Sequence, residues 1–274
     1  ILLDPSIDAV FIASATETHC DLIEQSVAAG KAVLCEKPIH LDIDRVNACR
    51  EAIACSNSAV QIGFNRRFDP GHVALQQAVA SGDIGNLEKL VLTSRDPAPP
   101  GVDYLKGSGG LFRDMMIHDF DLARSIFGEE PVEVSAMGSV LVDQRIGEIG
   151  DVDTAMVTMR MASGALCHIN CSRRCAYGYD QRVEAFGAKG MLISANPTPT
   201  NVERWLASGT SARPPLHHFF IERYAASYLA EIEAFVRTVE QGDNASPSFE
   251  DGRRALILAD AAGESAKTGR AVAI

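Results

Sequence analysis

The chain has 274 residues, of which 46% are hydrophobic and 22% are charged, and it carries a formal net charge of −11. This composition is typical of a globular protein with one large domain or two smaller ones. The acidic balance argues against a nucleic-acid backbone as partner. No run of residues reaches the ~20 apolar positions that a membrane helix needs, so we expect no membrane partner either.

Short apolar runs alternate with amphipathic segments in the first quarter of the chain. Residues 9–13, 32–35 and 59–63 are almost wholly apolar, which predicts strands buried on both faces of a parallel sheet. Helices are predicted between them, over residues 19–29 and 42–56. This β-α-β-α-β order indicates a doubly wound parallel sheet.

The pattern changes after residue 64. Consecutive strand candidates joined by short turns predict an α+β domain with a largely antiparallel open sheet. We therefore expect two domains, residues 1–64 and 65–274, with a last helix that could fold back onto the first domain. The predicted helices of the second domain are 70–81, 110–127, 221–241 and 249–268, and its strands are 87–93, 132–142, 153–161, 165–173, 181–186 and 191–194.

One predicted helix carries an acid/base pair. Asp114 and His118 are four residues apart, so on a single helix both side chains point the same way, and Asp121 stays near that face. Lys37 follows a buried strand, and ligands of doubly wound sheets bind beyond the carboxyl ends of strands. Histidine supplies a base that titrates near neutral pH, and lysine supplies a fixed positive charge. These residues are a candidate proton-handling set.

Neither the clustered cysteines nor an adjacent histidine pair is predicted to bind a metal. Cys167, Cys171 and Cys175 would spread over roughly 26 Å on one face of a strand, which is too far for one tetrahedral zinc. Adjacent His217 and His218 point in different directions, so we predict no metal site. The chain has seven cysteines, an odd number, which indicates reduced thiols and a cytoplasmic protein; the others are Cys20, Cys35, Cys49 and Cys55.

Three motifs occur in order along the chain: Glu36-Lys37-Pro38, then Asn65-Arg66-Arg67-Phe68, then Asp114-x-x-x-His118-Asp119-x-Asp121. Together they resemble the glucose–fructose oxidoreductase/inositol dehydrogenase/rhizopine-catabolism family (Gfo/Idh/MocA). Within that family, residues 94–97, 104–110 and 177–181 look most like bacterial inositol 2-dehydrogenases.

The resemblance implies an enzyme with a Rossmann domain that binds NAD, with NADP as an open alternative. It implies transfer of hydride from a secondary ring hydroxyl of a cyclic polyol, converting myo-inositol to 2-keto-inositol, by a homodimer or homotetramer. It assigns catalysis to Lys37, Asp114 and His118, with His118 as general base. The other sugar and polyol dehydrogenases of the family are the alternative.

The remaining site residues follow from the same resemblance and from their place at the sheet edge. Arg67 could instead pair with Glu36 or Asp69, and Tyr177 or Tyr179 could pack at a sheet edge. The cofactor side is expected to include Ser14, Ala15, Thr16, His19, Glu36, Lys37 and Pro38. The substrate side is expected to include Lys37, Arg67, Asp96, Asp114, His118, Asp121 and Tyr177.

The chain departs from the family pattern in one respect, because it contains no G-x-G-x-x-G turn. By analogy, about 60 residues holding the first βαβ unit would precede residue 1. A non-catalytic remnant is therefore a further alternative. The printed chain alone is also expected to be poorly soluble, because strands without neighbours leave apolar surface exposed.

Overall fold

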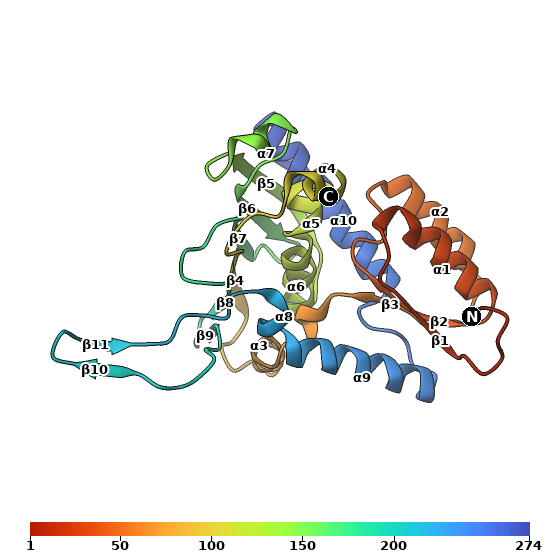
Figure 1. The fold of residues 1–274 in the computed structure, drawn as a ribbon, viewed down its shortest axis with the longest axis horizontal. Coiled ribbons are helices and arrows are strands. Elements are labelled where there is room, and N and C mark those ends of the chain that lie inside the picture. The colour runs from red at the N-terminus through yellow and green to blue at the C-terminus, as the bar shows by residue number, and fades with distance from the viewer.

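A parallel sheet forms the N-terminal part of the molecule (Figure 1). The structure, a computed structural model, describes residues 1–274. Its first sheet has the order β1-β2-β3, with parallel pairing throughout, and α1 and α2 pack beside it. The elements are β1 (Ala9–Ile12), α1 (His19–Ala28), β2 (Ala32–Glu36), α2 (Ile43–Ile53) and β3 (Val60–Gly63).

The expectation of burial on both faces is correct for β2 and β3 but wrong for β1. Phe11 of β1 is 56% exposed. Helices α1 and α2 cover one face of the sheet, while Phe235 from the C-terminal part packs against Ala32 and Leu34 on the other. Because Phe11 lies on the edge strand, beyond this contact, it stays open to solvent.

A seven-stranded sheet dominates the rest of the chain, in the order β12-β5-β6-β7-β4-β8-β9. Every pairing is antiparallel except that of β4 with β7. Alternation along β6 buries Val157, Met159 and Met161 completely on one face. The strands are β4 (Leu87–Arg95), β5 (Pro131–Ser139), β6 (Thr154–Met161), β7 (Leu166–Ser172), β8 (Asp180–Gly187), β9 (Gly190–Ser194) and β12 (Val272–Ala273).

Three helices cover one face of this sheet and enclose the larger core: α3 (Pro70–Ala80), α6 (Ile117–Phe127) and α10 (Phe249–Thr268). The bounds of α10 match the prediction. Its first turn is closed by a capping box, because Ser248 Oγ accepts from the Asp251 N–H while the Asp251 carboxylate accepts from the Ser248 N–H. Phe249 and Leu256 of α10 also enter the N-terminal core, so this helix joins both hydrophobic cores.

Two predicted helices are each divided in the structure. The helix over 110–127 is α5 (Gly110–Asp114) followed by α6, because the Leu111 carbonyl accepts from the N–H groups of both Met115 and Met116 and shifts the hydrogen-bond ladder by one residue. The helix over 221–241 is α8 (Phe220–Arg223) followed by α9 (Ala225–Gln241). Elements that the sequence did not predict are η1 (Thr16–Thr18), η2 (Asn65–Phe68), α4 (Val102–Ser108), α7 (Gln144–Glu148), β10 (Arg204–Leu206), β11 (Gly209–Ala212) and β12.

None of the helices combines the length and the apolar character that crossing a bilayer requires.

All seven cysteines are free, and Cys55 alone is exposed. Cys167, Cys171 and Cys175 are buried.

Candidate active site

A cavity of ≈ 890 Å³ lies at the carboxyl ends of β1 and β2, where the two sheets approach each other through their loops. Its walls come from segments far apart in the sequence. The first wall contains all seven residues predicted for the cofactor side, namely Ser14, Ala15, Thr16, His19, Glu36, Lys37 and Pro38.

His19 ties the two loops of this first wall together. Its Nδ1 lies 2.9 Å from the Pro38 carbonyl oxygen and its Nε2 lies 3.1 Å from that of Ser14. The ring is buried at the start of α1. The strand ends of β1 and β2 are therefore held at a fixed separation, with backbone and small side chains facing the cavity.

Lys37 and Asp114 meet across the cavity. Lys37 Nζ donates to the Asp114 backbone carbonyl oxygen at 2.7 Å and lies 3.5 Å from Asp114 Oδ1. Only 15% and 12% of the two side chains are exposed. An ammonium with three donors keeps a donor for a ligand after making these contacts.

Two residues that the sequence analysis missed complete the surroundings of Asp114. Tyr104 donates to Asp114 Oδ1 at 2.9 Å, and Arg173 Nη2 donates to Oδ2 at 3.2 Å. Burial alone would raise the pKa of the Asp114 carboxyl, but Lys37, Arg173 and the Tyr104 hydrogen bond hold this pKa below its usual value. Asp114 is therefore an anion held on several sides.

His118 lines the cavity from the first turn of α6. Its Nδ1 is buried without a hydrogen-bond partner, which leaves Nε2 as the nitrogen accessible from the cavity. The Phe64 ring meets the imidazole edge-on, with 6.0 Å between ring centroids. Burial, together with the positive charges of Lys37 and Arg66, lowers the pKa of His118 well below its usual value. The imidazole is thus neutral near pH 7 and able to accept a proton.

Asp96 is the remaining predicted substrate residue that lines the cavity. Burial raises its pKa to about 6, against the opposing effects of Arg173 and Arg66. Its side chain makes no hydrogen bond within the protein, so both carboxylate oxygens are available to hydroxyl donors.

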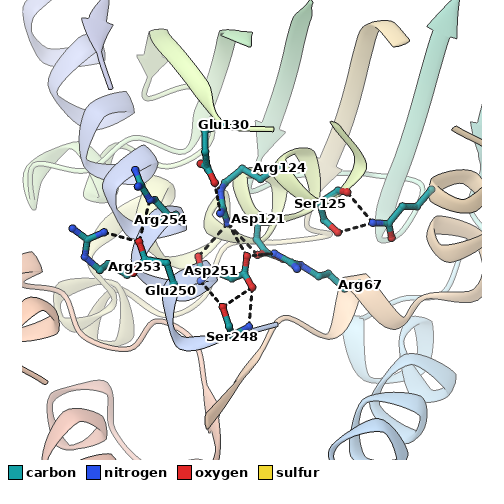
Figure 2. Close-up of polar contacts among 11 residues, drawn as sticks. Arg67, Asp121, Arg124, Ser125, Glu130, Ser248, Glu250, Asp251, Arg253 and Arg254 are labelled. Atoms are coloured by element: carbon teal, nitrogen blue, oxygen red, sulfur yellow. Dashed lines mark hydrogen bonds and ion pairs between the residues drawn. The ribbon is translucent and has the colours of Figure 1, made fainter. Parts of the chain in front are cut away.

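Arg67 and Asp121 lie outside the cavity, where η2, α6 and α10 meet (Figure 2). We call this place, formed by Arg67, Asp121, Arg124 and Asp251, the junction. Arg67 Nε donates to Asp121 Oδ2 at 2.7 Å, and the Arg67 guanidinium also lies 2.9 Å from Asp251 Oδ1. The prediction that Arg67 could instead form an ion pair is confirmed, but the partners predicted for it, Glu36 and Asp69, are wrong. Here a residue after β3, one on α6 and one on α10 are held together.

The junction encloses a second, smaller depression of ≈ 340 Å³ with no apolar lining residue. Arg124 donates to Glu130 at 2.8 Å and to Asp251 at 3.2 Å, as Figure 2 shows. Arginines and carboxylates are thus paired with one another around it.

Tyr177 is also outside the cavity, half-exposed near the beginning of β8. Its hydroxyl donates to Asp180 at 2.7 Å and accepts from Arg95 at 2.6 Å. Tyr179, two residues later, lines the cavity instead. Other cavity residues that sequence reasoning did not select as ligands include Asn65, Arg66, His218, Tyr224 and Tyr228.

Comparison with known proteins gives consistent matches. An oxidoreductase family with an NAD-binding Rossmann fold matches residues 1–64, and a GFO/IDH/MocA C-terminal domain matches residues 72–193. The chain is similar to an inositol 2-dehydrogenase of Rhizobium meliloti (strain 1021), with 49% identity over 98% of this chain and 81% of the relative.

Two solved structures are similar over nearly the whole chain. A myo-inositol dehydrogenase from Corynebacterium glutamicum ATCC 13032 gives a TM-score of 0.96 at 50% identity, over 99% of this chain and 81% of the other. A scyllo-inositol dehydrogenase from Lactobacillus casei, solved with bound cofactor NAD(H) and scyllo-inositol, gives 0.91 at 33% identity, over 99% and 82%.

Proposed function

The chain belongs to the Gfo/Idh/MocA family of NAD-binding oxidoreductases, and from that premise we propose that it oxidises myo-inositol to 2-keto-inositol with NAD. The observation that supports this most is the meeting of Lys37, Asp114 and His118 at one cavity, at the carboxyl ends of parallel strands. Catalysis by these three residues is part of the proposal.

In this proposal the cavity has a cofactor side and a substrate side. The residues at the ends of β1 and β2 fit a nicotinamide cofactor, since this edge of a doubly wound sheet is where such ligands bind and small residues such as Ser14 and Ala15 leave the backbone open there. When bound, the cofactor supplies the hydride acceptor. NADP is the alternative cofactor. Asp96 and Tyr179 on the opposite side offer polar atoms to a polyol ring.

Each proposed catalytic residue has a task that its surroundings support. His118 is neutral, and its accessible Nε2 takes the proton of the reacting hydroxyl. Lys37 keeps a donor for the same oxygen and stabilises its developing negative charge. Asp114 fixes Lys37 in the cavity and stays ionised.

The proposal extends to assembly and location. The uncovered face of the seven-stranded sheet exposes apolar side chains of paired strands, Met137 opposite Met156 and Phe186 opposite Met191, which supports a homodimer or homotetramer formed through this face. Seven free cysteines support a cytoplasmic location. Residues 1–64 form the cofactor domain in this proposal, and 65–274 the substrate and oligomerisation domain.

The test is direct. The protein, expressed from its complete reading frame, is mixed with myo-inositol and NAD while the absorbance of reduced nicotinamide is followed; scyllo-inositol, glucose and NADP are run in parallel. Turnover with myo-inositol above that with glucose supports the proposal. Turnover with another polyol alone would reassign the substrate, and failure to bind reduced nicotinamide would contradict the enzyme assignment.

A further inference from the structure

Arg173 is the most deeply buried cation at the cavity, with an exposed fraction of 1%. It directly follows β7 and continues the inward alternation of Cys167, Ile169 and Cys171. Its backbone N–H donates to the Asp153 carbonyl oxygen at 2.8 Å. The backbone of the residue is thus fixed independently of any ligand.

Its guanidinium reaches the proposed catalytic set. Nη2 donates to Asp114 Oδ2 at 3.2 Å, while Nε is buried without a partner. A buried arginine with an incomplete set of hydrogen bonds costs free energy, and an apolar side chain of similar volume at such a place is often neutral or stabilising. Stability alone therefore gives no reason for a cation at this position.

The effect of Arg173 falls on one carboxylate. Asp114 Oδ1 faces Tyr104 and Lys37, and Oδ2 faces Arg173, so the carboxylate is held from both ends. Without Arg173, one oxygen would lose its charged donor and the group could turn about its Cβ–Cγ bond. Lys37, which lies 3.5 Å from Oδ1, would then lose its fixed counter-charge.

We propose that Arg173 is a positioning residue: it holds the Asp114 carboxylate ionised and in the orientation that directs Lys37 toward the reacting oxygen. This inference rests on the proposed dehydrogenase function. Asp96 is the other acid near Arg173. Burial raises the pKa of Asp96 to about 6, and the charge of Arg173 opposes this rise. Lys37, Tyr104, Arg173 and Asp96 are the charged or titratable groups that act on Asp114.

The experiment compares Arg173→Met, Arg173→Lys and the matched control Arg174→Met in the complete protein. Arg174 is adjacent but exposed. The pH dependence of kcat/KM with myo-inositol is measured for each. Because an opposite charge at this distance lowers a carboxyl pKa by about 1–3 units, Arg173→Met should move the acidic limb upward by about one pH unit or more. Arg173→Lys keeps the charge and should keep that limb, with kcat lowered by roughly tenfold through lost geometry.

Repeating the comparison in an Asp96→Asn background separates the two acids: a shift that persists there belongs to Asp114. A folded Arg173→Met protein whose acidic limb coincides with that of the parent overturns the inference. If Arg173→Met does not fold, an Arg173→Lys protein with unchanged kcat overturns it as well.

A readout without turnover keeps this inference distinct from the proposed function. Carboxyl ¹³C NMR follows the aspartate titrations of parent and variants, and Asp114→Asn identifies the Asp114 resonance. Inactivity of the parent enzyme with every polyol would contradict the proposed function alone. A carboxyl titration of Asp114 that does not move in Arg173→Met would contradict the role of Arg173 alone.

Discussion

Helix α6 contributes to two regions that use the same residue types for opposite purposes. At the cavity, His118 leaves Nε2 accessible and the Lys37 ammonium keeps a donor free. At the junction, less than one turn further along the helix, Asp121 is paired with Arg67 and is only 1% exposed. The two regions differ in their unused hydrogen-bonding groups. Charged groups that are fully paired with one another stabilise a structure, whereas a charged group that keeps an unused donor or acceptor can act on a ligand.

The motif Asp114-x-x-x-His118-Asp119-x-Asp121 contributes to both regions. Residues Asp114 to Asp121 span the end of α5 and the start of α6. Asp114 and His118 line the cavity, whereas Asp121 contacts Arg67 at the junction. Arg67 at η2 and Asp251 at the start of α10 complete the junction. The cavity and the junction thus share one helix, although the paired residues of the junction do not line the cavity.

The largest expected effect is on stability and comes from the junction. Arg67→Met leaves buried Asp121 with Arg124, 3.9 Å away, as its remaining cation, which should lower the free energy of unfolding by about 3 kcal/mol. Urea unfolding measures this change, and kcat/KM of the folded variant should fall less than about threefold. A much larger loss of kcat/KM in the folded variant would contradict a purely structural role for Arg67, because Arg67 would then act on the cavity.

A matched double variant sharpens this test. Arg67→Met with Asp121→Leu removes both charges of the pair, and apolar replacement of a buried pair is often neutral, so much of the stability should return. Continued destabilisation equal to that of the single variant would show that Asp251, rather than Asp121, is the partner that matters.

The next effect is on catalysis and comes from the cavity. Lys37→Met removes the cation that we propose faces the reacting oxygen, so kcat/KM should fall by ~10²-fold or more. Thermal unfolding should shift by only a few degrees, since Lys37 makes a single hydrogen bond. Lys189→Met, at an exposed position, is the control and should keep both activity and melting temperature. Near-normal turnover of Lys37→Met would contradict its assigned role.

A smaller, pH-dependent effect is expected at Asp251. Burial alone would raise the pKa of this carboxyl, but Arg67 and hydrogen bonds from Ser248 lower it from 3.8 to about 2. A lowered folded-state pKa stabilises the protein above the unfolded-state pKa, and this contribution is lost as the pH falls through the folded-state value. Asp251→Asn should therefore be less stable by about 2 kcal/mol at pH 7.

The sign of this effect can be checked by urea unfolding at several pH values. The difference between Asp251→Asn and the parent should be constant above about pH 5 and close as the pH falls from about 4 to 2. Asp243→Asn, in an exposed loop, serves as control. A difference that stays constant down to pH 2 would mean that the amide loses only its cap hydrogen bonds.

The two regions also differ in how far the sequence predicted them. Lys37 and His19 were found because strand ends of a doubly wound sheet converge, and apolar runs locate those ends. The partners of Arg67 could not be ranked, since Asp121 and Asp251 reach it only through the packing of α6 and α10. Arg173 did carry a local signal, because alternation from Cys167 and Cys171 places it on the buried face.

Other differences have equally specific causes. The β10–β11 hairpin was missed because every one of its residues is exposed, so no buried face imposes a period on the sequence. The division between α5 and α6 was missed because a one-residue shift in hydrogen bonding at Met115 and Met116 leaves the helical period nearly unchanged.

The smallest expected effect compares two tyrosines on either side of the cavity wall. Tyr177→Phe removes a hydroxyl that is bonded to Asp180 and Arg95 outside the cavity, so kcat/KM with myo-inositol should change by less than about twofold. Tyr179→Phe removes a hydroxyl that makes no hydrogen bond within the protein and belongs to a cavity-lining residue. One lost hydrogen bond to substrate predicts a KM from a few-fold to about tenfold higher. Steady-state kinetics of both variants measures the contrast, and a larger loss for Tyr177→Phe would place the substrate on the opposite side of this wall.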